Sequence, residues 1–142
     1  MGHYEIALQE MQKQDPDIGH AEQLLRSARD NGDFRASYAL GTWYLHGRHF
    51  AKDTARALAL IREAADADLP DALFDLAVSY EKGVGVRKNA RKAVGLYLRA
   101  SLLGEKQSVY EVGRCYFHGI GVTQDRRVAR VWLDRARELG VE

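Results

Sequence analysis

The stretch Ala72–Gly104, ALFDLAVSYEKGVGVRKNARKAVGLYLRASLLG, decides the fold of this 142-residue chain. It predicts a helix, a loop with two glycines and a second helix, and its pattern recurs 36 residues earlier and 36 residues later. Glycine, tyrosine and alanine keep their places in three copies: Gly47, Gly83 and Gly119; Tyr44, Tyr80 and Tyr116; Ala57, Ala93 and Ala129. A fixed period of this length is typical of an all-α solenoid of helix pairs.

We interpret residues 1–142 as one solenoid domain. The period divides it into four copies. They are a degenerate copy at 1–35 and full copies at 36–71, 72–107 and 108–142. Capping residues and breakers predict helices over about 3–13, 17–30, 33–46, 108–118 and 125–139, with a further helix beginning at Asp53. Small residues such as Gly41 and Gly113 are expected where neighbouring helices approach closely.

The loop of the first full copy differs from the other two. Gly83–Val86 and Gly119–Val122 share the pattern Gly-x-Gly-Val, whereas His49 occupies the second glycine position in the first full copy. If that position has a positive φ, His49 is strained there, and glycine in its place would relieve about 1 kcal/mol. The alternative is a rebuilt loop in which His49 makes contacts of its own.

Composition excludes several classes of protein. The net charge is +1, no run approaches a membrane span, and the N-terminus lacks the apolar core of a signal peptide. Cys115 is the only cysteine, which excludes an internal disulfide and favours a cytoplasmic location. We interpret Cys115 as a structural thiol, since no histidine and aspartate are arranged around it as in a nucleophilic site.

The last copy carries a family resemblance, on these residues: Ser108, Val112, Gly113, Tyr116, Gly119, Gly121, Val122, Asp125, Ala129, Trp132, Ala136 and Gly140. This pattern resembles the Sel-one-like repeat, a relative of the tetratricopeptide repeat. The departures in other copies are His49 and Asp68 for glycine, and Leu60 and Leu96 for tryptophan. The resemblance implies a right-handed superhelix of antiparallel helix pairs that acts as a protein-binding adaptor or scaffold. Secreted relatives carry cysteine pairs that this chain lacks, which fits a reducing compartment.

No motif predicts an enzyme, a metal site or a cofactor site. The Gly-x-Gly-Val loops lie between two predicted helices, whereas a phosphate cradle lies between a strand and a helix. His46 and His118 share a repeat position, but two repeats separate them, so they cannot share a metal ion. No catalytic serine, zinc or β-lactamase motif occurs.

By the resemblance, the first helix of each pair lines a concave face. The groove residues that this assigns are Tyr38, Thr42, Leu45 and His46; Phe74, Val78, Glu81 and Lys82; Tyr110, Arg114, Phe117 and His118. We expect the aromatic ladder Tyr38, Phe74 and Tyr110 to bind an extended segment of a partner protein. The alternative is that these rings are partly core. Arg114, as a groove residue, is expected to add little to stability.

A second candidate surface is the basic run of Arg87, Lys88, Arg91 and Lys92. Residues 72–107 contain seven basic and three acidic side chains, while residues 1–35 contain four and seven. The run is either an ordinary solvated surface or a docking site for an acidic partner; nucleic acid is not expected, because aromatic side chains are absent from it.

The sequence therefore favours an interaction module that binds another protein. A bacterial immunity or antitoxin protein is the alternative within the binding class, and a hydrolase is the alternative outside it. Neither the partner nor the oligomeric state follows from these residues.

Overall fold

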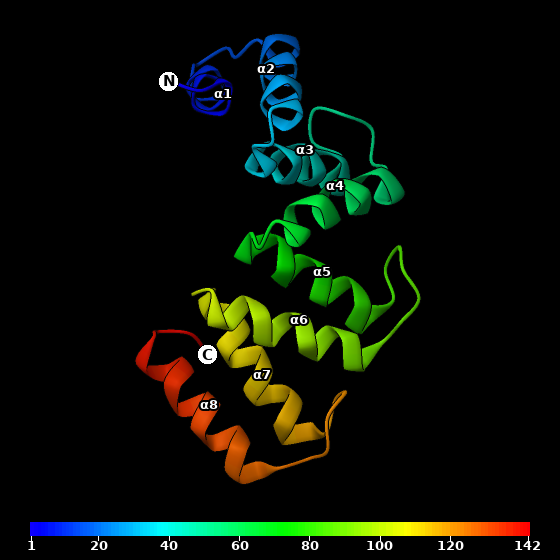
Figure 1. Cartoon of the computed structure of the whole chain (residues 1–142), viewed down its shortest axis with the longest axis vertical. Helices are drawn as coiled ribbons and strands as arrows, with labels where there is room; N and C mark the ends of the chain where they lie inside the picture. Colours follow the sequence, from blue (N-terminus) through cyan, green and yellow to red (C-terminus); the bar gives the residue numbers. More distant parts are fainter. The chain divides into compact units, whose positions relative to one another are not determined.

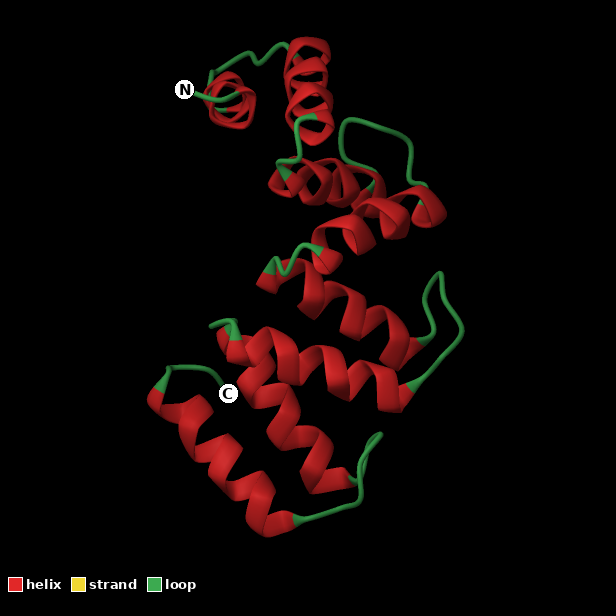
Figure 2. Ribbon diagram, viewed as in Figure 1, coloured by secondary structure: helices red, strands yellow, loops and turns green.

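The computed structural model describes residues 1–142 and contains eight α-helices and no strand (Figures 1 and 2). The helices are α1 (His3–Met11), α2 (Ile18–Asp30), α3 (Phe34–His46), α4 (Thr54–Asp66), α5 (Pro70–Lys82), α6 (Ala90–Leu102), α7 (Lys106–His118) and α8 (Arg126–Glu138). Every predicted helix is confirmed, with bounds that differ from the predicted ones by no more than two residues.

The chain forms two compact units, Met1–Ala67 with α1 to α4 and Asp68–Glu142 with α5 to α8. In the first unit α1 packs on α2, α2 on α3 and α3 on α4; in the second, α5 packs on α6, α6 on α7 and α7 on α8. Each unit thus consists of two helix pairs in which every helix contacts the next one along the chain. This is the all-α solenoid arrangement that the 36-residue period predicts.

Side-chain caps determine where the second helix of each pair begins. The side chains of Asp17, Asp53, Asn89 and Asp125 accept hydrogen bonds from first-turn amides of α2, α4, α6 and α8. These bonds satisfy amides that have no partner inside the helix. At the other end of the first helices, Gly47, Gly83 and Gly119 have left-handed backbones with φ of 63°, 71° and 71°. Glycine adopts this conformation without strain, so it ends α3, α5 and α7.

The second glycine of the loop also has a positive φ. In the last copy Gly121 has φ 70°, and a Cβ atom there would lie 2.3 Å from the carbonyl oxygen of Ala90. His49 has φ 66°, which confirms the left-handed backbone expected of it. Its ring also lies edge-on to Trp43, with centroids 4.7 Å apart. His49 therefore combines backbone strain with a contact of its own.

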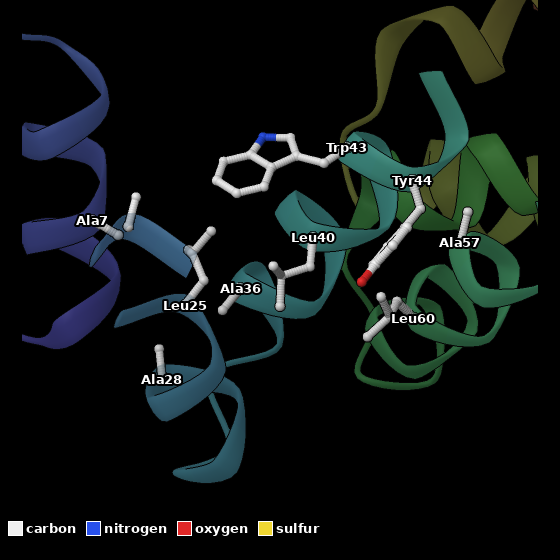
Figure 3. Packing of buried hydrophobic residues seen from close by; sticks show 10 residues of the cluster. Ala7, Leu25, Ala28, Ala36, Leu40, Trp43, Tyr44, Ala57 and Leu60 are labelled. Carbon is white, nitrogen blue, oxygen red and sulfur yellow. The ribbon is translucent and has the colours of Figure 1, made fainter. Parts of the chain in front are cut away.

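The first unit has an apolar core between its helices, and Figure 3 shows its members pointing toward one another from α1, α2, α3 and α4. Alanine supplies many of these positions: Ala7, Ala28, Ala36 and Ala57 are almost fully buried. In α3, Gly41 leaves room for Ile61 of α4, since a Cβ on Gly41 would lie 2.9 Å from the Ile61 side chain. Small side chains therefore allow close helix packing, as predicted for this position.

Candidate functional site

The groove residues of α5 lie along one side of that helix. Phe74, Val78 and Glu81 are half-buried, and Lys82 is exposed at the helix end. The Phe74 ring packs against Tyr97 of α6, with centroids 5.8 Å apart and planes inclined by 58°. Phe74 is therefore partly a core residue, and only part of its ring is open to a partner.

Glu81 and Arg114 join α5 to α7. The Nη2 atom of Arg114 donates to both carboxylate oxygens of Glu81 at 2.6 and 2.9 Å, and its Nε donates to Glu111 at 2.7 Å. Tyr97 adds a hydroxyl hydrogen bond of 3.0 Å to Glu81. The side chains of Glu81 and Arg114 are only 18% and 28% exposed. These bonds argue against the expectation that Arg114 adds little to stability, because its loss would leave two half-buried carboxylates without their cation.

Burial and pairing act in opposite directions on this network. Burial raises the pKa of Glu81, but hydrogen bonds from Arg114 and Tyr97 and the charge of Arg114 outweigh it, so the pKa falls below its usual value. The pKa of the Tyr97 hydroxyl is raised, first by burial and then by the Glu81 charge beside it. Around neutral pH the network therefore holds an ionised Glu81, a protonated Tyr97 and a charged Arg114. Its geometry presents Arg114 in a fixed orientation, with Nη1 making no hydrogen bond within the chain.

The groove residues of α7 have different neighbours. Arg114 extends toward α5, whereas Tyr110 and Phe117 line hollows beside α8. Tyr110 borders a hollow of about 350 Å³ with Leu133, Arg137, Val141 and Glu142. Phe117 borders another of about 350 Å³, where the guanidinium of Arg126 stands 4.6 Å from the centre of its ring. His118 is exposed at the helix end and touches Phe117 edge-on.

The groove residues of the first unit lie on α3. Tyr38, Thr42 and Leu45 are half-buried, and His46 is exposed. The Thr42 hydroxyl donates to the carbonyl of Ala39 at 2.8 Å, and Leu45 packs against the apolar core. Thr42 thus already uses its hydroxyl donor inside its own helix, and Leu45 is partly a core residue.

The basic run is open along its length. Arg87 and Lys88 are exposed in the loop before α6, and Arg91 and Lys92 are exposed in its first turn. The Lys92 ammonium stands 4.7 Å from the centre of the Tyr80 ring. A hollow of about 480 Å³ is lined by Tyr80, Val86, Arg87, Lys88, Asn89 and Lys92.

Some site features escape sequence reasoning. The roles of Glu111 and Tyr97 in the Arg114 network were not predicted; the only local signal was Glu111 three residues before Arg114, the spacing of a helical ion pair. In the first unit, the Tyr44 hydroxyl accepts from Arg26 at 3.2 Å and from Arg56 at 3.3 Å. No local pattern marks that convergence, since the two arginines come from different helices.

The structure contains no arrangement that points to catalysis through Cys115. The thiol is fully buried, and burial raises its pKa to about 11. It is therefore protonated at neutral pH and a poor nucleophile. Nowhere in the chain do three or more histidine, cysteine or carboxylate side chains gather as a metal-ion site would require. None of the eight helices has the length and apolar character needed to span a membrane.

Known proteins share both the sequence pattern and the fold. The Sel1 repeat model matches residues 3–33, 35–69, 70–105 and 106–141. None of the curated proteins matches. A Sel1 repeat protein from Oxalobacter formigenes is 36% identical over 83% of this chain and 89% of its own, with a TM-score of 0.77.

Two further solved structures extend the comparison. The c5321 protein of uropathogenic Escherichia coli, a protective antigen with an SLR fold, is 31% identical over 97% of this chain, with a TM-score of 0.90. This chain spans only 30% of the c5321 chain. Cysteine rich protein B (HcpB) of Helicobacter pylori shares the fold at 21% identity and a TM-score of 0.64, over 85% of this chain and 92% of its own. With four matched repeats over nearly its whole length, the chain belongs to the Sel1 repeat family.

Proposed function

We propose that this chain is an interaction module that binds a segment of another protein, and that α5 and α7 contribute the binding surface in the second unit. Sel1 repeat proteins are generally protein-interaction scaffolds. The observation that carries the finer proposal is the Glu81–Arg114 pair. It leaves the Nη1 atom of Arg114 without a partner, and half-exposed Phe74 and Val78 lie on the same side of α5 as Glu81.

This combination suits recognition of a polypeptide. Aromatic and arginine side chains contribute most of the binding energy at protein interfaces. A guanidinium already fixed by two carboxylates loses little rotamer freedom when it binds, so its remaining donor can bond a partner carbonyl at low entropic cost. Phe74 and Val78, on the same side of α5 as Glu81, supply apolar area. Tyr110 and Phe117 face α8 and are left out of this surface.

Site-specific photo-crosslinking tests the proposal. A benzophenone amino acid replaces Val78 in one variant and Val131 in the control; Val131 is 68% exposed on α8. We expect Val78 to crosslink a discrete protein in cells that Val131 does not capture. Purified, that protein should bind the parent chain, and Val78→Asp should weaken binding by more than about tenfold while Val131→Asp does not, since a charge in an apolar contact is costly. Equal binding by the two aspartate variants would show that α5 is not part of the interface.

A further inference from the structure

The first turn of α6 and the loop before it carry uncompensated positive charge. Residues 82–104 contain six lysines and arginines and no aspartate or glutamate. Only Arg99 has a carboxylate partner, Asp68. The other five have no carboxylate within ion-pair distance: Lys82, Arg87, Lys88, Arg91 and Lys92.

The N-cap of α6 also makes this region more positive than the start of the other three second helices. The N-caps of α2, α4 and α8 are the aspartates Asp17, Asp53 and Asp125, whereas the N-cap of α6 is the neutral Asn89. A helix N-terminus is already the positive end of the helix dipole, and cations placed there are unfavourable. Arg91 and Lys92 therefore meet this field without the negative cap that the other helices have.

The same place has a shaped hollow. Its walls include the aliphatic Val86 and the buried Tyr80 ring, and Arg87, Lys88 and Lys92 stand around it. On the other side of α6, the loop that follows α7 packs closely, with Gly121 directly against the carbonyl of Ala90. The first turn of α6 is thus supported by packing while its cations stay exposed.

We propose that this basic surface, defined by Arg87, Lys88, Arg91 and Lys92, docks an acidic segment of a partner protein. A carboxylate there would meet the cations and the helix dipole together. The exposed surface offers no ring for stacking bases, because Tyr80 is buried, which disfavours single-stranded nucleic acid. A hollow with an apolar wall can hold a protein side chain, whereas a flat membrane surface supplies nothing to fill it. The proposal stands apart from the α5/α7 surface, since it depends on none of Phe74, Val78 and Arg114.

Fluorescence anisotropy with labelled octaglutamate tests the proposal, with octaglutamine as the neutral probe. Lys88→Gln/Arg91→Gln removes two charges from the surface. Arg127→Gln/Arg130→Gln removes two exposed, unpaired charges from α8 and is the matched control. At low salt we expect the first pair to weaken octaglutamate binding by roughly five- to twentyfold and the control pair by less than about twofold. Octaglutamine should not bind.

Asn89→Asp separates binding from folding. Restoring the acidic cap of the other helices should raise the melting temperature by about 1–3 °C through the dipole and the nearby cations. The same change should weaken octaglutamate binding, because the new carboxylate competes for those cations. A variant that is more stable and binds less well is not what a purely structural role predicts.

Four results would overturn the proposal. Equal effects of the surface pair and the control pair would make binding a matter of net charge alone. Tighter binding of a thymidine octamer would indicate nucleic acid, and tighter binding of phosphatidylserine vesicles would indicate a membrane. Concentration-dependent self-association that Lys88→Gln/Arg91→Gln abolishes would indicate a second copy of this chain, whose residues 1–35 carry seven acidic side chains.

Discussion

Gly113 of α7 lies so close to Leu133 of α8 that a Cβ atom on Gly113 would stand 2.8 Å from the Leu133 side chain and 3.2 Å from its backbone nitrogen. The backbone contact cannot be relieved by a rotamer change alone. This close approach confirms the packing role predicted for small residues at that position.

Gly113→Leu should therefore overpack the α7/α8 interface and cost roughly 1–3 kcal/mol of unfolding free energy. Ala93→Leu should act in the same way, because Ala93 is fully buried. Gly95→Ala is the control: its Cβ would meet nothing within 4 Å, so higher helix propensity should stabilise the chain by up to about 1 kcal/mol. Urea unfolding followed by circular dichroism measures all three, and unchanged midpoints for both leucine variants would show that the packing is looser than described.

Arg114→Ala should destabilise the chain by about 1–3 kcal/mol, since it leaves Glu81 and Glu111 half-buried without their cation. The lowered pKa of Glu81 gives this effect a pH dependence. A group with a lowered folded-state pKa stabilises the fold above its unfolded pKa, and that contribution is lost as the pH falls through the folded value. The difference between parent and Arg114→Ala should thus shrink below about pH 4.5. A difference that stays constant from pH 7 to 3.5 would contradict this account.

Substitutions of His49 test whether its left-handed backbone is strained. His49→Ala removes the Trp43 contact and keeps a Cβ at φ 66°, while His49→Gly removes both the contact and the strain. His49→Gly should therefore be more stable than His49→Ala by about 1 kcal/mol. Since the ring contact is lost, we expect the glycine variant to come within about 0.5 kcal/mol of the parent. Thermal melts of the three proteins decide the order, and an alanine variant at or above glycine would rule out strain at this residue.

Cys115 should be unreactive in the folded protein. Its buried thiol has a pKa of about 11, so the nucleophilic thiolate is scarce at pH 8. Iodoacetamide labelling followed by mass spectrometry should show modification only at the rate of unfolding, and rapid modification after urea is added. Fast labelling in native buffer would mean that α7 opens locally around the thiol.

The basic surface illustrates the boundary between sequence and structure. Its positive charge is readable in the linear order, because no aspartate or glutamate occurs between Glu81 and Glu105. The sequence does not show that these cations lack a carboxylate partner, since partners can come from distant helices, as Asp68 does for Arg99. Asn89 stands 36 residues from Asp53 and from Asp125, so its neutrality follows from the sequence, but its meaning depends on the unpaired charges beside it.

The sequence by itself determined the repeat, the helices and their ends, because caps such as Asp53 and left-handed glycines such as Gly47 act through bonds only a few residues away. Which neighbouring helix each of these residues of α7 contacts was decided by tertiary structure. Tyr110 and Phe117 border hollows lined by α8, and Arg114 reaches α5 through a pair with Glu81, 33 residues away. Helical periodicity places residues on a face, but which neighbouring helix that face meets depends on packing between whole helices.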